Sequence, residues 1–283
     1  MNPTNPTAEA QVPLSELEQK IEALAERYRA SRGEDVDALV ELTDLLPYSD
    51  GEPLETPWQF AAIVLLKEIL FWHWRDRDDF YIGGDMFVYY SLDRLRKPEF
   101  RGPDFFYVSD VARHKSRDKW VVWAEGGKYP DLVIEFLSPS MADIDRTAKK
   151  ALYEKVWKTA EYFWYDPDLG ELQGWRLDTQ RKSYQPIPPD ERGWVWSAQL
   201  GLWLGRWSGR FHDIEDTWLR LYDANARLVP YQAEEYAAER QQAEAERRRA
   251  EDAERRAAAA EQEVARLKAR LAELEGHGPA APA

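Results

Sequence analysis

The run Asp131–Leu137, with the sequence DLVIEFL, limits the fold more than any other segment of the chain. Its length and nearly continuous apolar character are typical of a β-strand that is covered on both faces, so it predicts a central strand of a sheet. Glu135 interrupts this run. A buried carboxylate is costly unless it is paired with a cation or bound to a metal ion, so Glu135 is the most informative residue of the segment.

Helical and strand patterns surround the central strand. Apolar spacing predicts an amphipathic helix over residues 14–31 and a buried helix from Trp58 to Trp74. A third helix is expected from Asp143 to Tyr162, with an apolar face made of Ala148, Leu152, Val156 and Ala160. Further strands are predicted at Phe80–Ile82, Met86–Tyr90, Asp104–Val108, Trp120–Ala124, Tyr162–Tyr165, Leu172–Leu177 and Ser183–Ile187. A tryptophan-rich segment, Trp194–Trp207, follows, and the pattern as a whole indicates an α/β fold.

The segment Ala233–Glu275 consists almost entirely of Ala, Glu, Arg and Gln. Its apolar residues Val264, Leu267, Leu271 and Leu274 repeat at heptad spacing, which predicts a coiled coil. The alternative is a single solvated helix, because the earlier part of the seam is mostly alanine. We therefore expect a disordered N-terminus over 1–12, an α/β domain over 13–225, a long helix or coiled coil over 226–276 and a disordered tail over 277–283.

The composition excludes several classes of protein. A formal net charge of −14 argues against bulk attraction to nucleic acid, although one cleft can still be locally basic. The chain has no cysteine, so disulfides, thiolate zinc sites and a cysteine nucleophile are excluded. No run of about 18 apolar residues predicts a membrane span. The N-terminus, MNPTNPTAEAQV, lacks the features of a secretory signal, and we expect a cytoplasmic protein.

The segments RGPDFFYV (101–108), YPDLVIEFLSPS (129–140) and the helix that follows carry the candidate chemistry. They offer acidic residues on neighbouring strands and a lysine, Lys149, on the helix. Mg²⁺ prefers oxygen ligands and commonly uses one or two carboxylates. A bound metal polarises a phosphoryl group and lowers the pKa of the attacking water, and a nearby lysine stabilises the developing charge. These residues are therefore suited to hydrolysing a phosphodiester.

Strand geometry selects the pair of acids. On one regular strand, Asp131 and Glu135 would lie about 13 Å apart at roughly 3.3 Å per residue, too far to chelate one ion. Asp104 and Glu135 lie on different strands, and neighbouring strands are about 4.8 Å apart. This favours Asp104 with Glu135, and the backbone carbonyl of Phe136 could complete the metal shell.

Each of these residues could also serve the fold alone. Glu135 could form a structural ion pair, for instance with Lys149, and Asp104 could simply belong to a Gly-Pro-Asp turn. Lys149 could be a solvated helical lysine. Asp145, Lys149 and Tyr153 are four residues apart and share one helix face, which could look into the cleft. Two further acids, Glu55 and Glu68, could contribute, and Ser138 and Ser140 could cap the helix.

The motifs GPDFFYV, PDLVIEFLSPS and EYFWYDP, together with Asp145, Lys149 and Tyr153, resemble the Uma-two family of endonucleases within the PD-(D/E)XK superfamily. The resemblance runs from about Ser49 to Tyr222. It implies a restriction-endonuclease-like mixed sheet flanked by helices, a Mg²⁺ or Mn²⁺ requirement and a DNA substrate. The proline-aspartate acid of the superfamily corresponds to Asp104 and its second acid to Glu135. The superfamily's lysine position is Leu137 in this chain, so the lysine would come from the helix as Lys149.

The sequence therefore predicts a metal-dependent endonuclease with Asp104, Glu135 and Lys149 as catalytic residues. Asp145 and Tyr153 would support them, and the coiled coil would form a homodimer. One rival is a nuclease-fold protein without catalysis that acts as a coiled-coil binding or assembly module. Another is a DNA-binding protein that does not cleave, but no helix-turn-helix pattern or zinc-finger spacing supports it.

Overall fold

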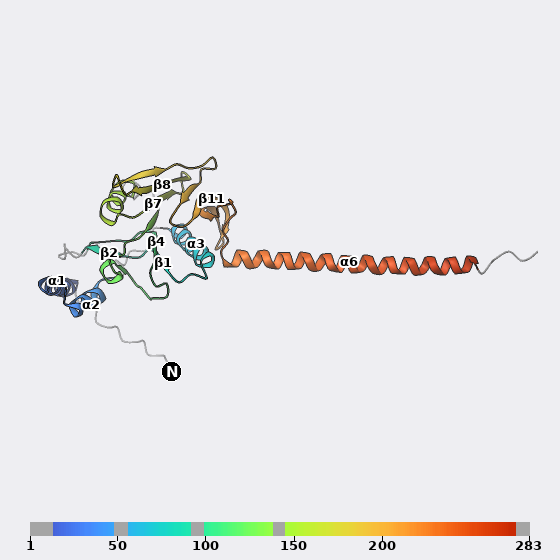
Figure 1. Ribbon diagram of the computed structural model, residues 1–283, viewed down its shortest axis with the longest axis horizontal. Helices are drawn as coiled ribbons and strands as arrows, with labels where there is room; N and C mark the ends of the chain where they lie inside the picture. Colours follow the sequence, from blue (N-terminus) through green and yellow to red (C-terminus); the bar gives the residue numbers. More distant parts are fainter. Residues whose placement is uncertain (1–13, 48–55, 92–98, 138–144, 276–283) are drawn as a thin grey trace, which may run out of the picture. The chain divides into compact units, whose positions relative to one another are not determined.

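The computed structural model describes residues 14–47, 56–91, 99–137 and 145–275 (Figure 1). The chain divides into two compact units, Met1–Val229 and Pro230–Ala283. The first unit holds all of the described strands, and the described part of the second contains one long helix.

A six-stranded mixed sheet forms the centre of the first unit. Its strand order is β1-β4-β6-β7-β8-β9. The central pair β6 and β7 is parallel, and the other pairs are antiparallel. The strands are β1 Phe80–Gly84, β4 Phe105–Ser109, β6 Leu132–Phe136, β7 Glu161–Asp166, β8 Glu171–Asp178 and β9 Ser183–Ile187. Every residue of β6 is buried, which confirms the predicted central strand and the mixed α/β fold.

Two three-stranded sheets complete the unit, in the orders β3-β2-β5 and β10-β11-β12. Their strands are β2 Val88–Ser91, β3 Glu99–Arg101, β5 Trp120–Val121, β10 Val195–Ser197, β11 Leu202–Phe211 and β12 Ile214–Tyr222. The strand predicted at Trp120–Ala124 is too long. It ends at Val121 and continues as a 3₁₀ turn, η1 Val122–Glu125, because Gly126 adopts a left-handed conformation with φ of 65° that closes the turn.

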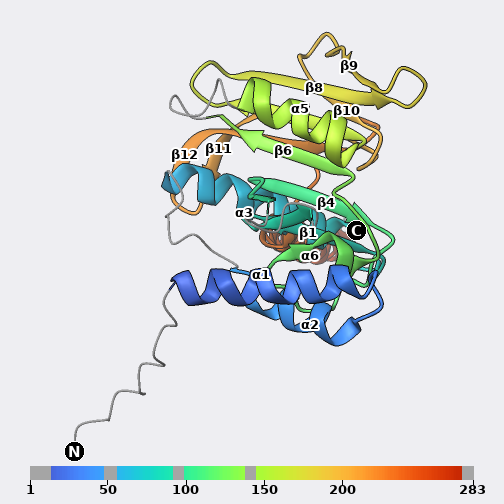
Figure 2. The ribbon, with the colours of Figure 1, turned by 90° about the vertical axis from the view of Figure 1, so that its left-hand side faces the viewer.

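Two helices, α1 Leu14–Ala30 and α2 Val36–Leu45, pack against each other (Figure 2). Their shared core contains Ile21, Leu24, Ala25, Ala38 and Leu42. Apolar spacing did not predict α2. The signal for it is Asp35, whose carboxylate accepts a hydrogen bond of 2.9 Å from the backbone N–H of Ala38 and so caps the helix.

The central sheet is covered on both faces. Helix α3, Pro57–His73, is capped by Thr56 and places Trp58 against Phe136 of β6, with ring centroids 5.6 Å apart. The segment Asp145–Trp157 lies on the other face, where Tyr153 contacts Glu135. Successive residues of a strand point to opposite faces of the sheet. Because Phe136 contacts α3 and Glu135 contacts the segment Asp145–Trp157, these two helical segments cover opposite faces. The buried helix predicted from Trp58 to Trp74 is therefore confirmed, although Phe60 is 58% exposed.

The helix predicted from Asp143 to Tyr162 ends earlier, and its packed face differs. The described part consists of a π-turn segment η2 Asp145–Lys149, a short α5 Lys150–Leu152 and a second π-turn segment η3 Tyr153–Trp157. Lys158 then adopts φ of 55° and ends the helix, so Ala160 is outside it. Tyr153 and Trp157 are buried, whereas Val156 is 49% exposed. Wide π turns change which residues align along the helix, and the larger aromatic side chains are the ones buried.

The second unit contains helix α6, Gln232–Glu275, with 44 residues. The side chains of Val264, Leu267 and Leu271 are 50%, 58% and 60% exposed, so their predicted seam has no covering within the described part of this chain. The side chain of Leu274 lies outside the described residues. No helix in the described part of the chain has the length and apolar character needed to cross a membrane.

Candidate active site

The register of β4 and β6 places Asp104 opposite Glu135. The two strands pair antiparallel, with Phe105 facing Ile134. Asp104 precedes Phe105 and Glu135 follows Ile134, so the same register continued by one residue sets the two acids across from each other. Asp131, in contrast, lies beside the other end of β6, where Ser109 donates hydrogen bonds of 2.7 Å and 2.8 Å to its Oδ2 from the backbone and the hydroxyl.

Asp104 is buried, with 8% of its surface exposed, and both of its carboxylate oxygens accept hydrogen bonds. Gln59 Nε2 of α3 donates to Oδ1 at 2.9 Å, and the backbone N–H of Phe136 donates to Oδ2 at 2.6 Å. The backbone carbonyl of Asp104 accepts a hydrogen bond of 3.1 Å from the N–H of Asp85. These contacts join the residue to α3, to β6 and to the end of β1.

Glu135 is fully buried and has two partners on the helical segment above it. Lys149 Nζ lies 3.1 Å from Oε2, and the Tyr153 hydroxyl donates to Oε1 at 2.6 Å. Lys149 ends the first π-turn segment and Tyr153 begins the second, so this irregular helix presents both side chains to one carboxylate. π-Bulges inside helices occur frequently at functional sites.

The ion pair between Glu135 and Lys149 is one of the alternatives that the sequence leaves open. A carboxylate paired with an ammonium and a hydroxyl is stable in a buried strand without a metal ion. The burial of Glu135 therefore does not by itself indicate a metal site. The Lys149 side chain keeps 14% of its surface exposed, so the pair is reached from solvent through the lysine.

The donor chemistry at Asp104 and Glu135 suits a divalent cation such as Mg²⁺. A carboxylate offers about four acceptor positions, and Glu135 uses two of them for Tyr153 and Lys149. One or two carboxylates, with carbonyl, water and phosphate oxygens, are a usual set of ligands for Mg²⁺. Among the described residues, no three Asp, Glu, His or Cys side chains gather into a larger cluster. A cation held by the two acids and the Phe136 carbonyl would therefore need further oxygen ligands from water or substrate.

The other predicted residues are placed as follows. The backbone of Asp145 begins the helical segment, but its side chain lies outside the described residues, as do Glu55, Ser138 and Ser140. Glu68 does not join the two acids. It lies on α3 with its carboxylate 3.9 Å from His212 Nε2. Leu137, at the lysine position of the superfamily, is 4% exposed and packs in the aromatic core beside Tyr153.

Gln59 is a site residue that the sequence motifs did not indicate. It is 9% exposed, and it is the polar residue in the otherwise apolar first turns of α3. A buried amide needs hydrogen-bonding partners, so a glutamine inside an apolar helix was a usable signal. Its partner could not be read from the sequence, because Asp104 follows 45 residues later.

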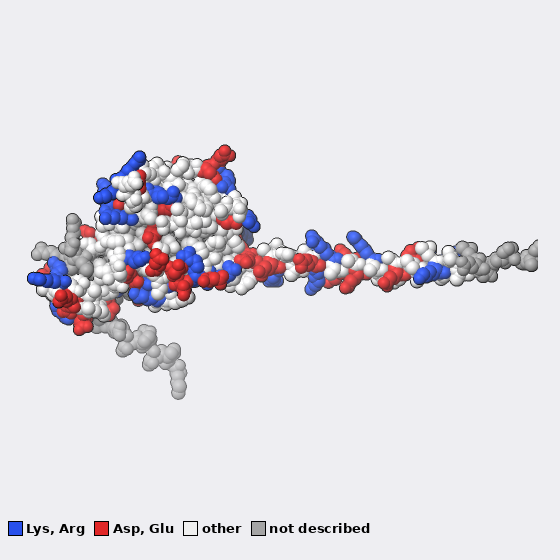
Figure 3. Space-filling model, in the orientation of Figure 1, with Lys and Arg blue, Asp and Glu red and all other residues white. Residues whose placement is uncertain are grey.

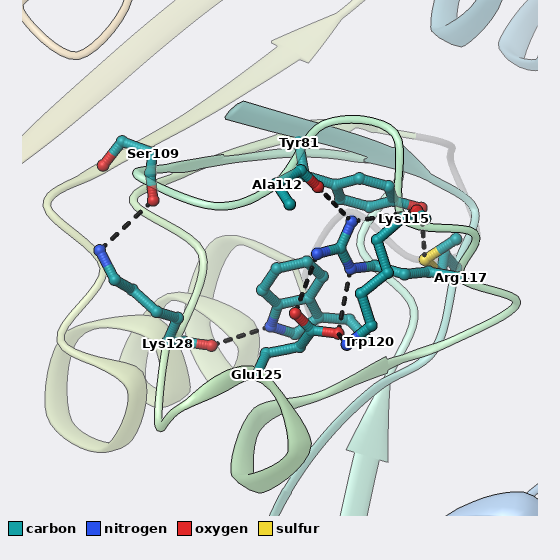
Figure 4. Close-up of polar contacts among 9 residues, drawn as sticks. Tyr81, Ser109, Ala112, Lys115, Arg117, Trp120, Glu125 and Lys128 are labelled. Atoms are coloured by element: carbon teal, nitrogen blue, oxygen red, sulfur yellow. Dashed lines mark hydrogen bonds and ion pairs between the residues drawn. The ribbon is translucent and has the colours of Figure 1, made fainter. Parts of the chain in front are cut away.

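A second, partly buried polar cluster, around Arg117 and Glu125, has a structural role (Figure 4). Arg117 donates to both oxygens of Glu125, at 3.0 Å and 2.9 Å, and its third nitrogen bonds the carbonyls of Ala112 and Lys115. Its guanidinium lies 4.7 Å and 5.0 Å from the ring centroids of Tyr81 and Trp120. Burial opposes ionisation of Glu125, but the hydrogen bonds from Arg117 and Lys115 outweigh it and lower its pKa. All of these groups are paired with one another.

Known proteins resemble this chain in structure or in sequence. A crystal structure described as a putative nuclease belonging to DUF820, from Anabaena variabilis, is 15% identical, with a TM-score of 0.40, and the match covers 58% of this chain and 89% of that one. No curated protein matches the chain. The sequence profile of the Uma2 family, described as putative restriction endonuclease, matches residues 37–209. This match spans most of the first unit and includes Asp104, Glu135, Lys149 and Tyr153, and the chain belongs to the Uma2 family.

Proposed function

We propose that this protein is a metal-dependent endonuclease that hydrolyses DNA phosphodiester bonds. The family supports a nuclease at a coarse level. The observation that carries the finer proposal is the pairing of β4 with β6, which sets Asp104 across from Glu135, with Lys149 at 3.1 Å from Glu135. Two hard oxygen donors with an adjacent cation are suited to hydrolysis of a phosphate ester.

Each residue has a distinct role in the proposed reaction. Asp104 and Glu135 would hold the divalent cation, with the Phe136 carbonyl as a third protein ligand. Bound there, a Mg²⁺ or Mn²⁺ ion supplies Lewis acidity and lowers the pKa of the attacking water. Lys149 orients that water or stabilises charge developing on the phosphoryl oxygens. Tyr153 and Gln59 are positioning residues, because they hydrogen-bond the two carboxylates and hold their orientation.

The surface charge indicates that DNA would be attracted to a limited part of the surface and not to the whole molecule. Acidic and basic side chains are interspersed on the face seen in Figure 3, and the whole chain has a net charge of −14. The chain has no excess of positive charge that would attract DNA from a distance. DNA binding therefore depends on a few Lys or Arg side chains at defined positions near the site.

A second candidate function is that of a catalytically inactive binding or assembly module. Two observations favour it: Leu137 fills the lysine position of the superfamily, and Lys149 is engaged in an ion pair. For either function, we propose that α6 pairs with α6 of a second copy. Pairing would cover Val264, Leu267 and Leu271, which are at least half exposed in the single chain.

The test is plasmid nicking by purified protein in Mg²⁺ or Mn²⁺, with chelator as the metal-free control. Asp104→Asn and Glu135→Gln should abolish nicking while circular dichroism shows a folded protein. Glu161→Gln is the matched control, because Glu161 is also fully buried and is paired with Arg176 at 2.8 Å. Equal nicking by wild type and both site variants would reject the site. No cleavage of any DNA, with no metal bound, would favour the assembly module.

A further inference from the structure

A groove lies along α3, next to the candidate site. It has a volume of about 370 Å³, and its helical wall consists of Phe60, Ile63, Val64, Lys67, Glu68 and Phe71. The facing wall is the end of β1, Gly84 and Asp85. Most of the helical wall is apolar, so charged groups in the groove are only partly hydrated.

Lys67 is the cation of this groove. It is half-buried, and burial lowers the pKa of its ammonium group. Among the residues that the structure describes, none forms a hydrogen bond or ion pair with this side chain. A partly desolvated ammonium without a partner costs free energy, which an anionic ligand would recover. The neighbouring Glu68 carboxylate lies near His212, on the turn between β11 and β12.

The groove reaches the backbone of Asp104. A Cβ placed on Gly84 would lie 3.3 Å from the carbonyl oxygen of Asp104 and also 3.3 Å from Cδ of Lys67. The side chain of Lys67 and the backbone carbonyl of Asp104, a candidate metal ligand, therefore both lie close to Gly84. Only a glycine allows this approach, because the same Cβ would also lie 2.5 Å from Cγ2 of Ile63.

An exposed aromatic ring stands in the same groove. Phe60 is 58% exposed and lies seven residues before Lys67, which is two turns along the same side of the helix. Proteins that bind nucleic acid often combine an exposed aromatic ring, on which bases pack, with a cation that contacts the phosphate.

We propose that Lys67 binds a backbone phosphate of the DNA adjacent to the scissile one, and that Phe60 packs against the neighbouring sugar or base. This inference rests on the proposed function, since it requires a DNA substrate at Asp104. Lys67 would then be a positively charged contact for DNA at a defined position, on a chain whose net charge is −14.

The test measures binding of a fluorescent DNA duplex by anisotropy in Ca²⁺, over a series of salt concentrations. Lys67→Met should weaken binding to a similar extent for different sequences and reduce the salt slope by about 1, as expected for one lost phosphate contact. Lys67→Arg should keep the affinity. Lys20→Met, which removes an equal charge from the exposed face of α1, is the matched control and should bind like wild type.

Thermal unfolding separates a binding role from a structural one. Methionine fills the apolar groove without a buried charge, so Lys67→Met should unfold at the same temperature as wild type or higher. Wild-type affinity and salt slope in Lys67→Met would overturn the inference while leaving the endonuclease proposal intact. Equal weakening by Lys20→Met would also overturn it, because the effect would then come from net charge. Absence of DNA binding by the wild type would overturn both proposals.

Discussion

The hydroxyl of Tyr153 donates a 2.6 Å hydrogen bond to Oε1 of Glu135, inside a strand where Glu135 has no exposed surface. This contact fixes one oxygen of the carboxylate, while Lys149 contacts the other. The carboxylate is therefore held in one orientation by the protein itself. Such preorganisation is what a metal ligand or a catalytic acid requires, and it also stabilises the fold.

Removing the tyrosine hydroxyl should destabilise the protein. Tyr153→Phe leaves one carboxylate oxygen of Glu135 without its donor, and hydrogen bonds to charged groups contribute about 1.5–3 kcal/mol. Urea denaturation measures the loss in the free energy of unfolding. Tyr28→Phe is the control, because no described residue hydrogen-bonds the Tyr28 hydroxyl. Equal stability of Tyr153→Phe and Tyr28→Phe would show that the 2.6 Å contact is not formed.

Removing the ammonium group of Lys149 should lower the free energy of unfolding more than removing the Tyr153 hydroxyl does. Lys149→Met leaves the buried carboxylate of Glu135 without a cation, and breaking a buried pair in this way costs about 3–5 kcal/mol. The double variant Glu135→Gln/Lys149→Met should regain part of that stability, which a double-mutant cycle measures. Lys155→Met, at an exposed position on the same segment, should be nearly neutral. Additive effects of the two site substitutions would contradict the pairing.

Gln59 should affect activity through Asp104. Gln59→Leu removes the 2.9 Å hydrogen bond to Oδ1 and leaves the carboxylate held by the Phe136 N–H. If Asp104 is a metal ligand, the variant should need a higher Mn²⁺ concentration for half-maximal nicking. Gln59→Glu adds a negative charge beside Asp104 and should lower the Mn²⁺ concentration needed for half-maximal nicking. An unchanged metal dependence in both variants would argue against Asp104 as a ligand.

The buried tyrosines should make the fold sensitive to alkali. Burial raises the pKa of Tyr81 to about 12 and that of Tyr165 to about 12, above the ordinary value of 10.0. Between pH 10 and 12 the unfolded chain releases these protons first, so stability falls as pH rises through this window. Stopped-flow absorbance of tyrosinate, recorded with circular dichroism, should show ionisation of these residues only as the chain unfolds. Complete ionisation of Tyr81 and Tyr165 while circular dichroism still shows a folded protein would contradict the burial of these two side chains.

The long helix should set the oligomeric state. Leu267→Glu with Leu271→Glu places charges in the predicted seam of α6 and should convert a dimer to a monomer, as measured by light scattering. Arg247→Glu with Arg255→Glu, at exposed positions of the same helix, changes charge outside that seam and should leave the mass unchanged. A monomeric wild type would reject the coiled coil.

Local sequence patterns determined the elements whose signals lie within a few residues. The apolar run around Glu135 became the buried strand β6, and the apolar helix from Trp58 became α3, because continuous burial leaves a continuous apolar pattern. The charged C-terminal repeat became one uninterrupted helix. The end of the helix at Lys158 was not predictable in the same way. It depends on a left-handed residue and on π turns that packing against the sheet stabilises.

Tertiary structure decided which of the open alternatives each site residue adopts. The sequence indicated Asp104, Glu135 and Lys149 and favoured Asp104 with Glu135, but it left a structural role open for each residue. The pairing of β4 with β6 set the two acids across from each other, and Gln59 met Asp104 across 45 residues of chain. Contacts between distant segments depend on strand register and on how the layers pack. Neither is encoded in the periodicity of any one segment, so only the folded chain specifies them.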